Sequence, residues 1–157
     1  MMGDQKPPRL AGDDRATLLA LLQYQRDSFV RKVLGVTAAE APASPVASGT
    51  SLLWLANHMA DAEETWVLRR FARQHRDPAR ASHRDTLEEA VKRYRTVCAE
   101  VDAVVARAQN LDQECPPFDT EPPINLRWIL AHLLEETARH AGHADILREL
   151  LDESTGR

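Results

Sequence analysis

Residues 126–151, with the sequence LRWILAHLLEETARHAGHADILRELL, decide the fold class. Apolar side chains recur along this segment at steps of three and four residues, which places them on one face of an α-helix. The positions are Leu126, Ile129, Leu130, Leu133, Ala144, Leu147 and Leu151, with Thr137 at the same spacing. We therefore expect a long amphipathic helix that begins near Asn125 and turns this face toward a core.

Three further segments have helical spacing. The expected helices run from Asp13 or Asp14 to Gly35, from about Thr50 to about Gln74, and from Thr86 to about Ala108. Thr86 and Glu89 form a capping box, and Gly35 suits the position just past a helix end. Sustained alternation of period two, which would indicate strands, does not occur. The sequence predicts an all-α protein, a four-helix bundle with antiparallel or crossover connections.

The first-to-second and third-to-fourth connections are long for simple turns, and the latter contains Pro-Pro pairs at 116 and 122. Connections of this length can form a lid or a pocket wall. We expect one domain over residues 13–151, a flexible N-terminus over residues 1–12 and a tail over residues 152–157.

The composition is typical of a globular domain, with 157 residues, 43% apolar content and a formal net charge of -4. This charge argues against nucleic-acid binding, which needs clustered Lys and Arg. No segment reaches the roughly 18 apolar residues of a membrane span, and the first residues lack the apolar core of a signal peptide. Cys98 and Cys115 form no disulfide or zinc-ribbon pattern. We expect a cytoplasmic protein that binds neither nucleic acid nor membranes.

The sequence also predicts which of several other side chains are buried and which are exposed. The apolar stripe of the second helix is predicted to consist of Leu52, Leu55, Met59, Ala62 and Trp66, and Trp54 and Trp128 are expected in the core or lining a pocket. Cys98 should behave as a small buried hydrophobe. Cys115, which precedes two prolines, is expected to be exposed.

Ionisable side chains interrupt the apolar face of residues 126–151. His140 falls inside the stripe, Glu136 lies one turn earlier, and His132 and His143 follow the same edge. Carboxylates are seldom buried unless they are paired or bound to metal. A Glu and a His four residues apart project two ligand atoms from one helix face. The second helix offers His58, on the shoulder of its stripe, as a third ligand.

Two imidazole nitrogens and one carboxylate oxygen would hold a divalent metal ion and leave positions open for water and substrate. Zinc or nickel is the first expectation, and iron or manganese also suits these donors. His132 or His143 could replace Glu136, or could orient a ligand from outside. Glu63, His132 and His143 are candidates for a catalytic base, and Glu63 could instead fix a ligand imidazole.

Residues 51–71, SLLWLANHMADAEETWVLRRF, together with LRWILAHLLEETARHAGHADILREL at 126–150, resemble the DinB-like superfamily of YfiT-like metalloenzymes. The resemblance is strongest to an actinobacterial branch related to mycothiol-dependent maleylpyruvate isomerase. It implies a four-helix bundle whose metal ligands are one histidine of the second helix and two residues four apart on the last. The matching residues are His58, Glu136 and His140.

The resemblance also implies an activity, the transfer or isomerisation of a small electrophile with a low-molecular-weight thiol such as mycothiol. A metal would act there as a Lewis acid. The chain has no room for the additional C-terminal domain of the isomerase, so maleylpyruvate is not the expected substrate. Two alternatives stay open, a metal-dependent hydrolase that activates water and a non-catalytic, metal-stabilised stress-response bundle. A homodimer is compatible with each of them.

Overall fold

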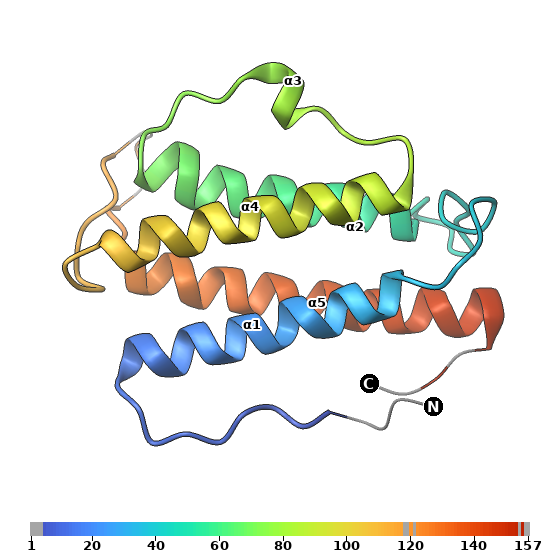
Figure 1. Cartoon of the computed structure of the whole chain (residues 1–157), viewed down its shortest axis with the longest axis horizontal. Coiled ribbons are helices and arrows are strands. Elements are labelled where there is room, and N and C mark those ends of the chain that lie inside the picture. The colour runs from blue at the N-terminus through green and yellow to red at the C-terminus, as the bar shows by residue number, and fades with distance from the viewer. Residues whose placement is uncertain (1–4, 118–119, 121, 154, 156–157) are drawn as a thin grey trace.

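A computed structural model describes residues 5–117, 120, 122–153 and 155. Four long helices run side by side and form a bundle (Figure 1). They are α1 (Asp14–Val33), α2 (Leu52–Glu63) with its π-helical continuation η1 (Glu64–Phe71), α4 (Leu87–Arg107) and α5 (Leu126–Asp152). The short helix α3 (Pro78–Ala81) lies in the connection above α4. The predicted all-α four-helix bundle is confirmed.

Side chains that precede the helices fix their first turns. Asp13, Ser51, Thr86 and Asn125 each accept a hydrogen bond from a backbone N–H in the first turn of the helix that follows. Such caps satisfy donors that have no partner inside the helix. Gly35 adopts a φ of 91° two residues after α1 ends, a conformation that glycine reaches without strain. The predicted helix starts therefore hold to within one or two residues.

The second helix differs from its prediction in two ways. It changes from α to π geometry at Glu64 and ends at Phe71, before the expected Gln74. Arg73, with a φ of 54°, breaks the helical path there. Its buried face also contains Glu63 and Val67 in place of the predicted Ala62 and Trp66. Ala62 and Trp66 are partly buried and pack against the core at the edge of this face, because an arginine on another helix stabilises Glu63 at its buried centre.

The core has two apolar parts with a polar layer between them. Along α1, Arg26 lies between Leu22 of one part and Phe29 of the other, and along α5 Thr137 separates Leu133 from Ala141. Glu63 occupies the corresponding position on the second helix. All three polar residues are buried. Apolar packing thus forms both ends of the bundle, and polar contacts join the helices at its middle.

Other expectations have mixed outcomes. Cys98 is buried, as predicted, but Cys115 is also buried, because its backbone N–H pairs with the carbonyl of Ile124 and holds the segment against the bundle. Trp54 and Trp128 lie outside the core, each with more than two fifths of its surface exposed. Residues 1–4 of the expected N-terminus and 154, 156 and 157 of the expected tail lie outside the described residues. Along the part that is described, no helix has the length and apolar character needed to cross a membrane.

Candidate metal centre

His58, Glu136 and His140, the donor triad, lie together where α2 packs against α5. One ligand atom from each residue lies within 4.8 Å of the other two. The Oε2 atom of Glu136 is 3.4 Å from Nε2 of His140 and 3.9 Å from Nε2 of His58. The four-residue spacing on α5 accounts for the first contact. The second exists only because α2 approaches α5 with His58 on the facing side.

The chemistry of the donor triad fits a divalent metal ion. Its carboxylate lies within ion-pair distance of two imidazoles, which carry charge only when protonated, and among the described residues no Lys or Arg pairs with it. Two nitrogens and one oxygen are a set that zinc and other first-row metals accept. The side chains of His58, Glu136 and His140 are 33%, 22% and 12% exposed, so the triad borders solvent. A ligand could reach it from one side.

The electrostatics of His140 favour its neutral form. Burial lowers the pKa of this imidazole and the neighbouring His58 lowers it further, while Glu136 acts in the opposite direction. A neutral imidazole keeps the lone pair that a metal requires. Ala141, rather than His140, occupies the centre of the buried stripe, because the helical repeat leads from Thr137 to Ala141 and Ala144. His140 therefore lies at the border of the core, where the prediction had placed it inside.

Aromatic rings flank the donor triad on both sides along the helices. Trp54 stacks on His58 with ring centroids 4.8 Å apart and an interplanar angle of 9°. In the other direction along α5, Trp128 stacks on His132 at 4.9 Å, and Trp66 of η1 packs against both rings. We call Trp66, Trp128 and His132 the aromatic cluster.

The three candidates for auxiliary roles have different surroundings. His143 lies beside the triad, with its Nδ1 atom 3.2 Å from Nδ1 of His140. His132 belongs to the aromatic cluster and lies 3.7 Å from Glu135. Glu63 accepts hydrogen bonds on both carboxylate oxygens from Arg26, at 2.7 Å each. The structure thus brings His143 to the triad and directs Glu63 to α1.

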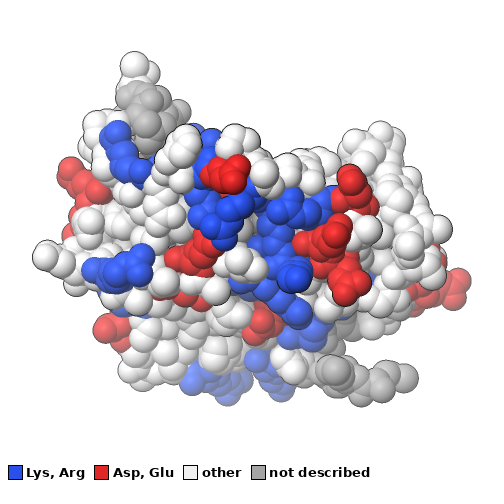
Figure 2. Space-filling view, turned by 45° about the horizontal axis from the view of Figure 1, so that its top comes forward, with Lys and Arg blue, Asp and Glu red and all other residues white. Residues whose placement is uncertain are grey.

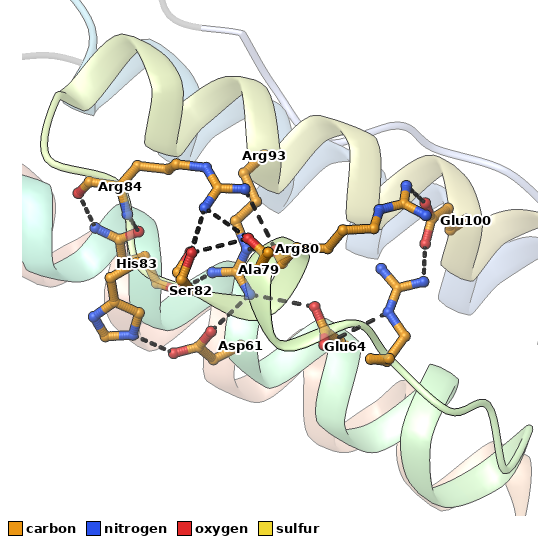
Figure 3. Close-up of polar contacts among 11 residues, drawn as sticks. Asp61, Glu64, Ala79, Arg80, Ser82, His83, Arg84, Arg93 and Glu100 are labelled. Carbon is orange, nitrogen blue, oxygen red and sulfur yellow. Dashed lines mark hydrogen bonds and ion pairs between the residues drawn. The ribbon is translucent and has the colours of Figure 1, made fainter.

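Sequence reasoning missed two buried arginines that pair with successive glutamates. Arg26 binds Glu63 and also donates to Asp102 at 2.8 Å. Arg93 of α4 binds Glu64 at 3.2 Å and Asp61 at 2.8 Å, as Figure 3 shows. The sequence holds a signal for Arg26, because it lies four residues after Leu22 and three before Phe29, on the face that these apolar residues share.

Two arginines that follow the second helix join the same polar network. Arg76 pairs with Glu64 and Glu100, and Arg80 pairs with Glu100. Figure 2, in which the side with α3 is turned forward, shows basic and acidic side chains next to each other over this region. The arginines of this side therefore stabilise the α3 connection through protein carboxylates.

Comparison with protein families agrees with this architecture. The family model described as Mycothiol-S-transferase matches residues 17–153, nearly the whole chain. The chain belongs to this family. The match spans all four long helices and includes every residue of the donor triad, and it bears out the resemblance to DinB-like proteins. A search of curated proteins gave no match for the chain.

Proposed function

We propose that this member of the Mycothiol-S-transferase family is a metal-dependent transferase that joins the sulfur of a mycothiol-type thiol to a small electrophile. The carboxylate of Glu136 supports this proposal most directly. It lies between two imidazoles at the edge of solvent and has no cationic partner among the described residues. A carboxylate in that state is suited to a metal ion.

The donor triad would hold the ion through one atom of each side chain. A bound divalent metal supplies Lewis acidity, which stabilises a thiolate at neutral pH. His143 would set the tautomer of His140, since a proton on Nδ1 of His140 donated to Nδ1 of His143 leaves the lone pair on Nε2, the atom nearer Glu136. This orientation prepares the imidazole as a ligand.

The net reaction is a substitution at the electrophile. The thiol loses its S–H proton to solvent, an electron pair of sulfur forms the new S–C bond, and the leaving group departs with the electrons of the bond that breaks. No oxidant or reductant is required. The triad is partly exposed and supplies three protein ligands, so a fourth position would remain for a reactant, whereas a purely structural metal site is closed by protein ligands.

A conjugation assay tests the proposal. Zinc-loaded protein is incubated with mycothiol and 1-chloro-2,4-dinitrobenzene, and the aryl thioether and chloride are measured. We expect product formation that depends on both thiol and metal and falls at least about 100-fold in His140→Ala, a size typical of the loss of a catalytic group. Glu149→Ala, which removes an exposed glutamate of the same helix away from the triad, is the control and should keep its activity. Chloride release without thiol would indicate hydrolysis and overturn the transferase proposal.

A further inference from the structure

The exposed ring of Trp128 lies on the same helical stripe as the donor triad. Trp128, His132, Glu136 and His140 follow each other on α5 at steps of four residues. At 1.5 Å per residue, Trp128 lies about 12 Å along the helix from Glu136. The aromatic cluster therefore lies beside the metal centre, further toward the N-terminal end of α5 and against η1.

Trp128 is held rigidly although it is 44% exposed. Its ring stacks on His132 with an interplanar angle of 16°, and Trp66 packs against it at a centroid distance of 5.3 Å. Trp66 in turn lies beneath the guanidinium of Arg70, at 4.3 Å from the ring centroid. Stacking of this kind fixes the indole before a ligand arrives, so binding to its free surface loses little conformational entropy.

The open surroundings of Trp128 favour one kind of ligand. A small apolar molecule is bound well in a pocket that encloses most of its surface, and the half-exposed indole would leave much of it in water. A polyhydroxylated ring has a face of C–H groups that can stack on an indole and hydroxyl groups at its rim that stay hydrated. Arg70 and Glu135, which border the aromatic cluster, can exchange hydrogen bonds with such hydroxyls.

We propose that the aromatic cluster, through Trp128, binds the uncharged polyhydroxylated rings of the thiol substrate while the sulfur lies at the donor triad. The inference rests on the proposed function, which supplies a thiol of the mycothiol type. Mycothiol carries its cysteine on two linked, uncharged polyol rings, so the sulfur and the distal ring are well separated along the molecule. The distance along α5 between Glu136 and Trp128 suits a thiol whose sulfur and distal ring are far apart. The metal ligands alone would not distinguish this thiol from free cysteine.

Steady-state kinetics with two thiols test the subsite. The KM of Trp128→Ala is measured for mycothiol and for N-acetylcysteine, which has the same reacting group without the rings. We expect the KM for mycothiol to rise about tenfold and the KM for N-acetylcysteine and the kcat to stay unchanged. Ile146→Ala, which removes a more exposed apolar side chain from the same helix, is the control and should leave both KM values unchanged. Trp128→Phe, which retains an aromatic ring, should restore most of the loss.

Unchanged KM for mycothiol in Trp128→Ala would overturn the subsite, and so would an equal rise for both thiols, because the effect would then arise at the reacting group. A direct titration separates this failure from that of the proposed function. The pseudo-disaccharide of mycothiol without its cysteine is titrated into each zinc-loaded protein and binding is followed by isothermal titration calorimetry. Even if no conjugation is detected, about tenfold weaker binding to Trp128→Ala supports the subsite, and equal or absent binding overturns it.

Discussion

The carboxylates of the second helix and that of Glu136 on α5 have opposite surroundings. Glu63 and Glu64 are buried at the α2–η1 junction, and each binds an arginine from another helix. Glu136, on α5, is partly exposed, and among the described residues its ion-pair partners are two imidazoles. The buried carboxylates are neutralised by arginines of the protein itself. The carboxylate of Glu136 converges with two imidazole nitrogens, a set of donors that a metal ion accepts.

This difference separates structural from functional polar residues. A buried ion pair is complete, and removing one partner leaves an uncompensated charge in the core. In the donor triad, a metal ion would supply the positive charge that Arg26 supplies to Glu63. Substitutions in the two regions should consequently respond in different ways to metal.

The largest effect is expected at Arg26. Replacing it by Ala leaves Glu63 buried without a partner, so the free energy of unfolding should fall by about 3–5 kcal/mol, measured by urea denaturation. Zinc should not restore the loss, because the pair lies outside the donor triad. Burial raises the pKa of Cys98, beside this pair, so its thiol should resist alkylation at pH 8 in the native protein and react faster in the variant.

A double variant checks the interpretation of Arg26. Replacing both partners, as Arg26→Met with Glu63→Leu, removes both charges and should leave stability near that of the native protein. If the double variant were as unstable as Arg26→Ala, the loss would come from packing of the arginine side chain and not from the unpaired carboxylate.

Glu136 should show the second-largest effect, and only in the presence of metal. Zinc at about 100 times its dissociation constant should raise the free energy of unfolding of the native protein by about 2.7 kcal/mol. In Glu136→Gln most of this stabilisation should disappear, while the metal-free variant unfolds like the metal-free native protein. Thermal denaturation with and without zinc gives both values, and Glu135→Gln is the control. An undiminished zinc effect in Glu136→Gln would contradict the role of this residue as a ligand.

A smaller effect is expected at Asp102, the third member of the Arg26 contact. Its side chain is 49% exposed, so water solvates it in both folded and unfolded states. Asp102→Ala should lower the free energy of unfolding by about 1 kcal/mol, because Arg26 keeps both bonds to Glu63. A loss as large as that in Arg26→Ala would mean that the three charges act as one unit.

The smallest effect is expected at Arg139, which forms a surface ion pair with Glu135 on α5. Exposed pairs of this kind contribute little, so Arg139→Ala should change the free energy of unfolding by no more than about 0.5 kcal/mol with or without zinc. Urea denaturation at two salt concentrations checks this expectation. A larger change that depends on zinc would show that the influence of the donor triad extends along the helix.

The sequence by itself determined the four long helices and the pairing of Glu136 with His140. Apolar spacing, capping residues and the four-residue interval act locally, so they can be read along one segment. His58 is a weaker candidate from its own helix and gains most from the family resemblance, because spacing within one helix says nothing about the facing helix.

Only the tertiary structure decided where Arg26 and Glu63 lie and which tryptophans stay exposed. Two charged residues distant in the sequence can enter a core together, although each alone would be expelled from it. Glu63 could thus occupy the centre of the buried face, with the predicted Ala62 and Trp66 partly buried at its edge and Trp66 against the exposed Trp128. An ion pair between two helices is stable only when both side chains are present in the core. The sequence of one segment therefore cannot predict it.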